Sequence, residues 1–119
     1  MIGMAHVLDD YPLYYDAMNE KGLCIAGLNF VTSAVYQPPM PDRDNVAQFE
    51  LIPWLLGRCA TAAQARALLE HANITDEPFC EGLPLARLHW LIADRHETIV
   101  LEATADGLHI YDDPVGVLT

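Results

Sequence analysis

The chain has 119 residues, enough for one domain or for part of a larger one. Apolar residues make up 52% of it, so we expect a packed core and not a disordered chain. Acidic residues outnumber basic ones by 17 to 6, and the net charge of -11 disfavours nucleic acid and anionic membrane surfaces as partners, because both present negative charge.

The first third of the chain is predicted to be β structure. Extended runs cover residues 2–8, 13–18 and 23–30, and a turn at residues 19–22 joins the second run to the third as a hairpin. In the third run, alternate side chains are largely apolar on both faces of the strand. We therefore expect this strand to be covered on both sides.

The middle of the chain is predicted to begin with a proline-containing loop at residues 31–44. A helix follows, because Phe49, Ile52 and Leu56 recur at helical spacing. Pro53 leaves the start of this helix open, since a proline in a helix interior costs about 3 kcal/mol. A later start that puts Pro53 in the first turn would remove the conflict.

A second helix is signalled more clearly. Thr61 and Gln64 form a capping-box pair, which satisfies backbone N–H groups at a helix start. The apolar residues that follow lie on one stripe of that helix: Ala65, Leu68, Leu69 and Ala72.

The last third of the chain is predicted to return to β structure. Runs at residues 88–93 and 98–103 flank a turn at 94–97, and a second turn at 104–107 leads into a run at 108–111. Strands, then two helices, then strands again predict an α+β fold in which the helices cover an antiparallel sheet. The chain begins and ends inside extended runs, so we expect it to be an internal piece of a longer protein.

The sequence predicts neither a disulfide framework nor a metal site. Cys24, Cys59 and Cys80 are widely spaced, and no Cys/His ligand cluster occurs. We expect buried free thiols in a reducing compartment. Because no apolar run is long enough to cross a membrane and no secretory pattern occurs at the start, we expect a cytoplasmic location.

Most polar residues taken singly predict structural or surface roles. The carboxylate pairs at residues 9–10 and 112–113 fit turns better than a paired-acid site, and the Asn73 glycosylation sequence means little without a secretory signal. The histidines are scattered, without a catalytic or metal-binding spacing: His6, His71, His89, His96 and His109.

Asn29 is the polar residue that stands out. It is an amide late in an otherwise apolar strand, and it follows Gly27, whose missing side chain lets another group come close. A buried amide must find hydrogen-bond partners, which belong either to the backbone or to a ligand. The residues alone favour the structural role and leave the ligand role open.

Longer strings of the sequence are specific when taken together: Asp9–Pro12, Met18–Leu23, Ala26–Phe30, Phe49–Gly57, Leu88–Asp94 and Pro114–Thr119. In order and spacing they resemble successive motifs of the choloylglycine hydrolase family, which contains bile salt hydrolases and penicillin V acylases. The resemblance covers essentially all of residues 1–119. It implies the central part of a longer subunit, without the N-terminal nucleophile segment and the C-terminal part.

The resemblance implies part of the four-layered αββα sandwich of N-terminal-nucleophile (Ntn) hydrolases. It implies hydrolysis, without a cofactor, of a linear amide in a small molecule: the glycine or taurine conjugate of a bile acid, or penicillin V. In the family, an N-terminal cysteine attacks the amide carbonyl. Here Ile2 follows Met1 and every cysteine is internal, so we expect no nucleophile in this chain and no activity from it alone.

The resemblance also assigns site residues. Asn29 matches the oxyanion-hole asparagine, whose backbone N–H helps to hold the tetrahedral oxygen. The family's second donor directly follows the Val-Leu-Thr motif that ends here at Thr119. Apolar residues are placed beside the acyl pocket, with ordinary core packing as an equal alternative for each: Leu8, Phe79, Leu83 and Leu88.

The sequence departs from the family pattern at two places. Asp113 stands where asparagine is usual, and Arg87 stands beside the pocket where a smaller residue is usual, a change that could alter substrate preference. The resemblance implies a homotetramer for the complete protein. Two alternatives to a bile salt hydrolase remain: a penicillin V acylase, and a non-catalytic piece that docks on a partner carrying the other half of the sheet.

Overall fold

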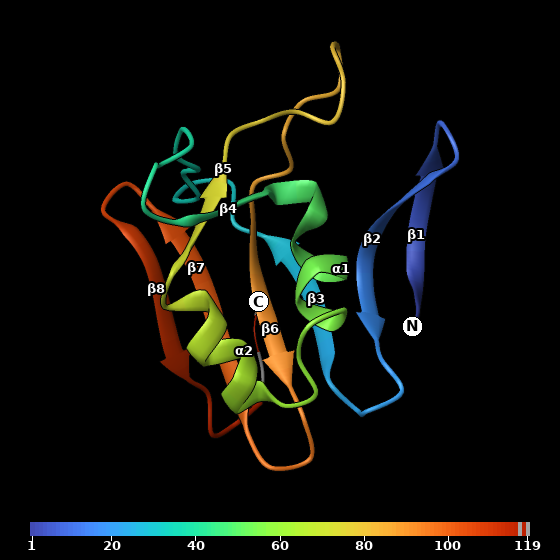
Figure 1. Ribbon diagram of the computed structural model, residues 1–119, viewed down its shortest axis with the longest axis vertical. Helices are drawn as coiled ribbons and strands as arrows, with labels where there is room; N and C mark the ends of the chain where they lie inside the picture. Colours follow the sequence, from blue (N-terminus) through green and yellow to red (C-terminus); the bar gives the residue numbers. More distant parts are fainter. Residues whose placement is uncertain (117, 119) are drawn as a thin grey trace.

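The computed structural model describes residues 1–116 and 118. Its largest element is a six-stranded sheet with the strand order β1-β2-β3-β6-β7-β8, in which every neighbouring pair is antiparallel (Figure 1). The strands are β1 (Ile2–Leu8), β2 (Tyr11–Met18), β3 (Cys24–Asn29), β6 (Leu88–Ala93), β7 (Thr98–Thr104) and β8 (Gly107–Asp112). With two covering helices, this sheet confirms the predicted α+β class.

The helices α1 (Leu51–Leu56) and α2 (Ala62–Leu69) lie on the same face of the sheet, as Figure 1 shows. The core forms between them and the central strands, because the apolar stripe of each helix meets the apolar face of β3, β6 and β7. Its largest fully buried side chains include Leu23, Ile25, Leu51, Leu55, Trp90 and Ile92.

Pro53 occupies the first turn of α1. A short 3-10 turn, η1 (Gln48–Glu50), precedes this helix, and Glu50 is its N-cap. The first turn has no intrahelical acceptor for backbone N–H groups, so the N–H that proline lacks is not missed there. The later of the two possible helix starts is therefore correct.

Helix α2 begins as the capping pair predicts. The Thr61 hydroxyl accepts a hydrogen bond from the Gln64 N–H at 3.1 Å, and the Gln64 side chain accepts one from the Ala60 N–H at 2.7 Å. The helix ends at Leu69, and Ala72 lies in the next strand, so the prediction of Ala72 on the helical stripe is wrong.

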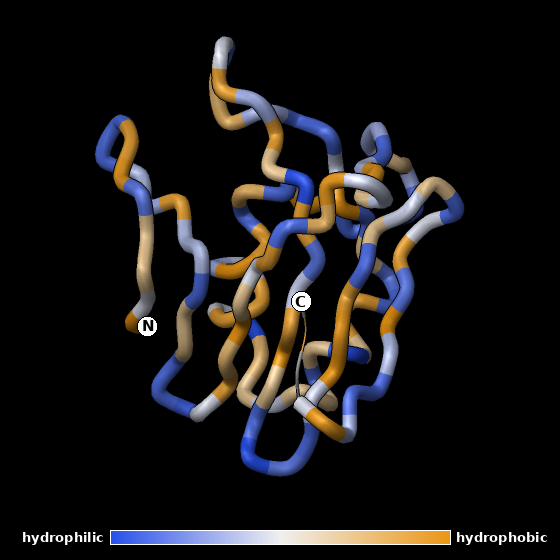
Figure 2. Tube along the Cα trace, turned by 180° about the vertical axis from the view of Figure 1, so that it is seen from behind, coloured by the Kyte–Doolittle hydropathy of each residue, from blue (hydrophilic) through white to orange (hydrophobic). Residues whose placement is uncertain are grey.

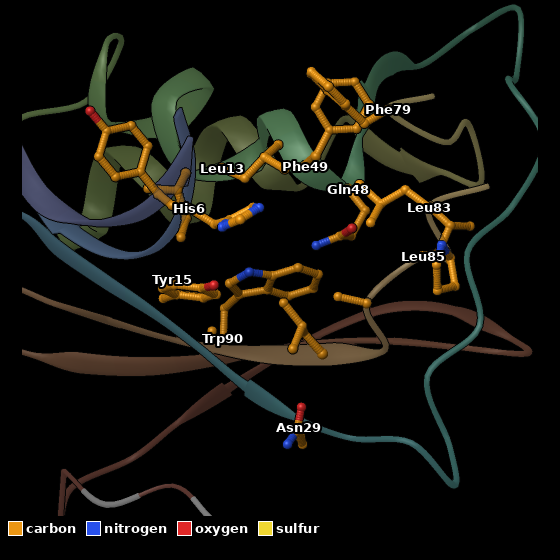
Figure 3. Close-up of a pocket in the computed structure, with 16 residues that line it drawn as sticks. His6, Leu13, Tyr15, Asn29, Gln48, Phe49, Phe79, Leu83, Leu85 and Trp90 are labelled. Atoms are coloured by element: carbon orange, nitrogen blue, oxygen red, sulfur yellow. The ribbon is translucent and has the colours of Figure 1, made fainter. Parts of the chain in front are cut away.

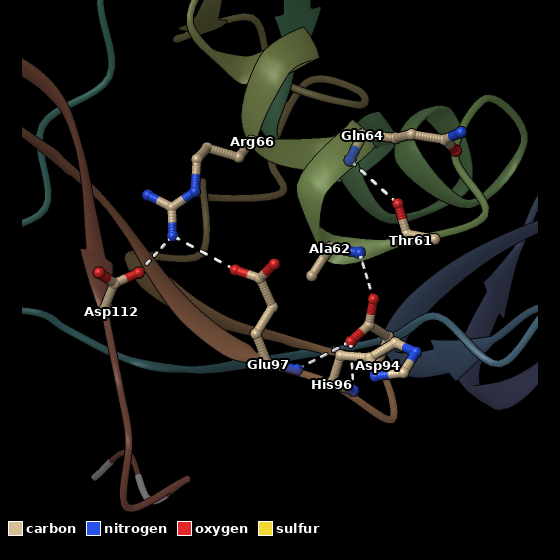
Figure 4. A network of polar contacts seen from close by, with 8 residues as sticks. All are labelled: Thr61, Ala62, Gln64, Arg66, Asp94, His96, Glu97 and Asp112. Carbon is tan, nitrogen blue, oxygen red and sulfur yellow. Dashed lines mark hydrogen bonds and ion pairs between the residues drawn. The ribbon is translucent and has the colours of Figure 1, made fainter.

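Asp94 fastens the start of α2 to the turn between β6 and β7 (Figure 4). One carboxylate oxygen accepts from the Ala62 N–H at 2.8 Å, and the other accepts from the N–H groups of residues 96 and 97 at 2.8 and 2.9 Å. These hydrogen bonds, with that from Ala62 foremost, hold the pKa of Asp94 below its ordinary value. The carboxylate therefore stays ionised at neutral pH.

Arg66 makes a second tie between α2 and the sheet. Its guanidinium contacts Glu97 on the β6–β7 turn at 3.5 Å and also pairs with Asp112 at the end of β8 (Figure 4). All three side chains are at least partly exposed, so this network contributes less to stability than the Asp94 hydrogen bonds.

A second, two-stranded sheet was not predicted. Strands β4 (Asp44–Ala47) and β5 (Ala72–Thr75) pair in parallel on the helix side of the main sheet (Figure 1). Each has four residues and finds its partner across the whole helical segment, so local periodicity carries little signal for either. Asn73, in the glycosylation sequence, is buried there and donates to the Pro38 carbonyl.

The tight turn between β1 and β2 is formed by Asp9 and Asp10. Both have positive φ, 51° and 61°, which is the backbone shape that two-residue hairpins require and that Asp tolerates well. The interpretation of this carboxylate pair as turn residues is confirmed.

The opposite face of the main sheet carries no helix or strand of the described residues (Figure 2). In β3, Ile25 is buried beneath the helices, whereas Cys24, Ala26 and Leu28 on this far face are only half-buried. The expectation that β3 is covered on both sides therefore does not hold within residues 1–116. A shallow apolar groove runs over the far face, lined by residues of β1, β2, β3 and β6.

Candidate functional site

A cavity of about 330 Å³ opens on the helix side of the sheet. Its walls come from the β1–β2 hairpin, the start of the helical segment, the loop before β6, and the strands β3 and β6. The lining is mainly apolar and aromatic with a few polar groups, as in pockets for small organic molecules. Figure 3 shows side chains of widely separated segments, among them Tyr15, Gln48, Phe49, Leu83 and Trp90, gathered around it.

Gly27 and Trp90 form the floor of the cavity. They are cross-strand partners in the β3–β6 ladder, and Trp90 is almost fully buried. A Cβ atom added at Gly27 would lie 3.1 Å from a Leu88 methyl group and 3.3 Å from the Trp90 ring nitrogen. The missing side chain therefore leaves room for the indole and for the space above it.

Asn29 lies at the rim of this cavity, at the end of β3 and opposite Leu88. In Figure 3 it sits apart from the other labelled lining residues. The side chain is exposed, so the expectation of a buried amide is wrong. The physical reason is that β2 and β3 separate before Asn29 is reached, since their pairing ends at Asp16 opposite Ala26.

The backbone N–H of Asn29 points away from β6. In an antiparallel ladder, pairs that exchange hydrogen bonds alternate with pairs that do not. The Phe30 N–H donates to the Arg87 carbonyl at 2.8 Å, so the neighbouring pair, Asn29 opposite Leu88, does not exchange hydrogen bonds. The Asn29 N–H therefore faces the gap on the β2 side, beyond the last paired residue, Ala26.

The structure brings together most of the residues that the resemblance assigned to a pocket. Phe79, Leu83 and Leu88 line the same cavity as Asn29. The Phe79 ring also packs against Phe49, with ring centroids 5.2 Å apart. Leu8 is not among the lining residues, because it pairs with Tyr11 at the tip of the β1–β2 hairpin.

Tyr36 fixes the segment that leads into β6. Its hydroxyl donates to the Ala86 carbonyl at 2.5 Å and accepts from the Leu88 N–H at 2.9 Å. Burial raises the pKa of Tyr36 to about 12, so the hydroxyl stays protonated and can donate at any physiological pH. Sequence reasoning missed this residue, because its partners lie some fifty positions away and leave no local signal.

The polar groups of the cavity were likewise not assigned from the sequence. His6, Tyr15 and Gln48 line it together with Asn29. His6 was interpreted as a structural or surface residue, and it is exposed at the cavity wall. These groups come from three separate segments, so their convergence is a property of the fold alone.

The cysteines lie away from the cavity. All three are free, with Cys59 buried and Cys24 and Cys80 half-buried, so burial of the thiols is confirmed for Cys59 only. Burial raises the pKa of Cys59 and keeps it a protonated thiol. Among residues 1–116 and 118, no group of three or more His, Cys, Asp or Glu side chains is placed to hold a metal ion. No helix within that part is long and apolar enough to cross a membrane.

The sheet, its helical cover on one face and the apolar cavity define a layered α+β protein with a small-molecule pocket. The chain belongs to the choloylglycine hydrolase family, described as linear amide C-N hydrolases, whose sequence profile matches residues 1–119. This confirms the resemblance found in the sequence strings.

The relatives of the chain include curated bile salt hydrolases. The chain is 52% identical over 119 residues to a bile salt hydrolase/transferase of Lactiplantibacillus plantarum. This match covers all of the chain and 37% of that protein. The chain is also 37% identical over 121 residues to a bile salt hydrolase/transferase of Clostridium perfringens, with the same coverage. The chain thus spans little more than a third of the length of these relatives.

Solved structures agree with this assignment. A crystal structure of a mutant conjugated bile acid hydrolase from Clostridium perfringens superposes with a TM-score of 0.95 at 38% identity, covering 98% of this chain and 36% of that one. Penicillin V acylase from Agrobacterium tumefaciens superposes with a TM-score of 0.71 at 22% identity, covering 89% of this chain and 32% of that one, and shows likeness of fold alone.

Proposed function

We propose that residues 1–119 are the central part of a cysteine Ntn hydrolase that cleaves the amide bond of conjugated bile salts. The observation that carries this proposal is the cavity, which has an apolar floor and, at its rim, the Asn29 backbone N–H that takes no part in the β3–β6 ladder. The names of the relatives supply the substrate class. For the complete protein, we infer a homotetramer from the family resemblance alone, and a cytoplasmic location from the sequence pattern.

The proposed chemistry divides the work between this chain and the rest of the protein. The thiol of an N-terminal cysteine from another segment gives its proton to the α-amino group of that cysteine and attacks the amide carbonyl, whose oxygen becomes an oxyanion in the tetrahedral intermediate. When the intermediate collapses, the C–N bond breaks and glycine or taurine leaves as the amine with that proton. Water then hydrolyses the thioester and frees the cysteine. The Asn29 N–H faces a gap with no strand of this chain in residues 1–116 to fill it, so it is available as a donor to that oxygen. The acyl group occupies the cavity against Phe79, Leu83 and Leu88. Thr119, beside the family's second donor, lies outside the described residues.

A chimera tests this function directly. These 119 residues replace the matching segment of the Lactiplantibacillus plantarum relative, and release of glycine or taurine from conjugated bile salts is measured. We expect the chimera to be active and the isolated chain to release nothing. Faster turnover of penicillin V than of glycocholate would indicate a penicillin V acylase instead. A chimera that folds but hydrolyses neither substrate would favour a non-catalytic binding role.

The oxyanion role of Asn29 has its own test. In the chimera, Asn29→Pro removes the backbone N–H, whereas Asn29→Ala removes the side chain and keeps that donor. Proline suits this position, because the lost N–H takes no part in the β3–β6 ladder. We expect kcat to fall roughly 100- to 1000-fold for the proline variant and far less for the alanine variant. Equal losses would show that the backbone donor plays no part.

A further inference from the structure

His89 is a buried group for which the proposed reaction has no use. It lies on the far face of the sheet, is only 3% exposed, and neither ring nitrogen has a hydrogen-bond partner within residues 1–116 and 118. Its Nδ1 atom lies 3.5 Å from a carboxylate oxygen of Glu102 on strand β7, close enough for an electrostatic contact. Buried polar groups are usually hydrogen-bonded, so the burial of this imidazole without a hydrogen bond needs an explanation.

His89 contacts both neighbours of Asn29. It is the direct cross-strand partner of Leu28, on one side of Asn29. On the other side, the Phe30 ring stacks on the imidazole, with ring centroids 4.4 Å apart and planes within 8° of each other. Asn29 thus lies between two neighbours of His89, one paired with it across the strands and the other stacked on its ring.

Ladder hydrogen bonds hold the backbone on either side of Asn29, including that from the Phe30 N–H to the Arg87 carbonyl, but none restrains the Asn29 N–H itself. Strand β2 has already separated from β3, and the ladder to β6 leaves this group unbonded. The aim of the N–H therefore depends on the residues before and after it. Because a misplacement of about 1 Å at a reacting centre can cost a hundredfold in rate, such a restraint bears directly on catalysis.

We propose that His89 is a positioning residue, which Glu102 orients and which aims the Asn29 N–H at the oxyanion through its stack on Phe30. The contact with Glu102 keeps the plane of the imidazole parallel to the Phe30 ring. This inference rests on the proposed function, because it assigns His89 to the oxyanion hole of that same site.

The chimera carries the test, with variants on the far face of the sheet. His89→Leu removes the imidazole and Phe30→Leu removes the ring stacked on it. His109→Leu is the control, because His109 is the cross-strand partner of Glu102 on its other side and stacks on Tyr111, far from β3. Thermal unfolding is followed by circular dichroism, so that kcat and KM are measured only on folded protein.

We expect kcat for a conjugated bile salt to fall roughly tenfold or more in His89→Leu and in Phe30→Leu, with KM changed less than about twofold. The double variant should be hardly worse than either single one, because both remove the same stack. His109→Leu should behave like the parent. If His89→Leu does not fold, the kcat of Phe30→Leu tests the proposal instead, because Phe30 is only half-buried and its replacement disturbs folding less.

Several results would overturn the inference. One is a kcat of His89→Leu or Phe30→Leu equal to that of His109→Leu. Another is a rise in KM at constant kcat, which would point to the acyl pocket instead. Losses that multiply in the double variant would show that the two rings act independently. A parent chimera without amidase activity overturns the proposed function as well, so the two failures are distinguishable.

Discussion

Gly27 shows how a single missing side chain shapes the cavity. We expect Gly27→Val to lower the free energy of unfolding by about 1–3 kcal/mol, because the added carbons meet Leu88 and Trp90 within van der Waals distance. Urea denaturation measures the effect. Ala26→Val is the matched control, since Ala26 is half-buried on the far face of the same strand. A similar loss in both variants would contradict the close contact above Gly27.

At the residue scale, the sequence predicted a site role for Asn29, which stays a prediction, and misjudged the burial of its side chain. The string around it matches the family, and Gly27 next to it marks a close approach. Its exposure follows from where β2 leaves β3, which depends on long-range pairing and not on neighbours in the sequence. For the same reason, Tyr36 and the polar groups of the cavity could not be found beforehand.

Among the elements, helix α2 and the β6–β7 turn meet at Asp94, which accepts one hydrogen bond from the Ala62 N–H of the helix and two from N–H groups of the turn. We expect Asp94→Ala to cost about 1–3 kcal/mol of stability at pH 7, the cost of leaving such donors without a partner. Thr61→Ala, which removes the cap at the same helix end, should cost about 1 kcal/mol. Chemical denaturation of both variants compares them, and an Asp94→Ala cost below that of Thr61→Ala would contradict the larger role of Asp94.

Asp94 also predicts a pH dependence. Its pKa is lowered on folding, so the stability it contributes is fully present above the unfolded value of about 3.9 and is lost as the pH falls through the folded value. The stability difference between the parent and Asp94→Asn should therefore shrink as the pH is lowered from 5 to 3. Denaturation curves at each pH measure it, and a difference that stays constant would show that the carboxylate charge is not involved.

Pro53 predicts a contrast within helix α1. Because it lies in the first turn, Pro53→Ala should change the free energy of unfolding by less than about 1 kcal/mol. Leu55→Ala, in the same helix but fully buried, should cost about 2–5 kcal/mol. Denaturation midpoints of the two variants measure this contrast. A large loss of stability in Pro53→Ala would mean that the proline is needed to start the helix.

At the scale of elements, sequence patterns predicted most of the main sheet. The run at residues 88–93 matches β6 in full, and the Thr61–Gln64 pair marks the start of α2. The β4–β5 pair was not predicted, because each strand is short and the two are separated in the sequence by both helices. Ala72 fitted a helical stripe by spacing, but its pairing with Asp44 overrides that local preference.

For the molecule as a whole, the apolar far face of the sheet and the net negative charge have opposite effects on self-association. Met4, on strand β1, is 67% exposed and belongs to the apolar groove of that face. The net charge of -11 keeps chains apart at low salt, and salt weakens this repulsion. We expect the isolated chain to self-associate as the salt concentration rises from about 0.05 to 0.5 M, since the screening length shortens severalfold.

Static light scattering of two matched variants tests this expectation. Met4→Lys places a charge in the groove, opposite Asp16, and should suppress the association. Val115→Lys changes the net charge equally at a residue that is 80% exposed and lies outside the groove, so it should have little effect. Equal effects would show that net charge, and not the apolar face, controls the association.

The Tyr36 hydroxyl bonds where the loop that lines the cavity joins strand β6. On either side of this point, the cavity residues differ in how freely they can be substituted. The floor at Gly27 and Trp90 belongs to the sheet, so a substitution there disturbs folding before it alters recognition. Phe79 and Leu83 lie on a segment outside the main sheet, which the Tyr36 hydroxyl and the Phe30 N–H hold just before β6. New acyl specificities should therefore arise in residues 79–85, where the protein can vary its choice of substrate without endangering its architecture.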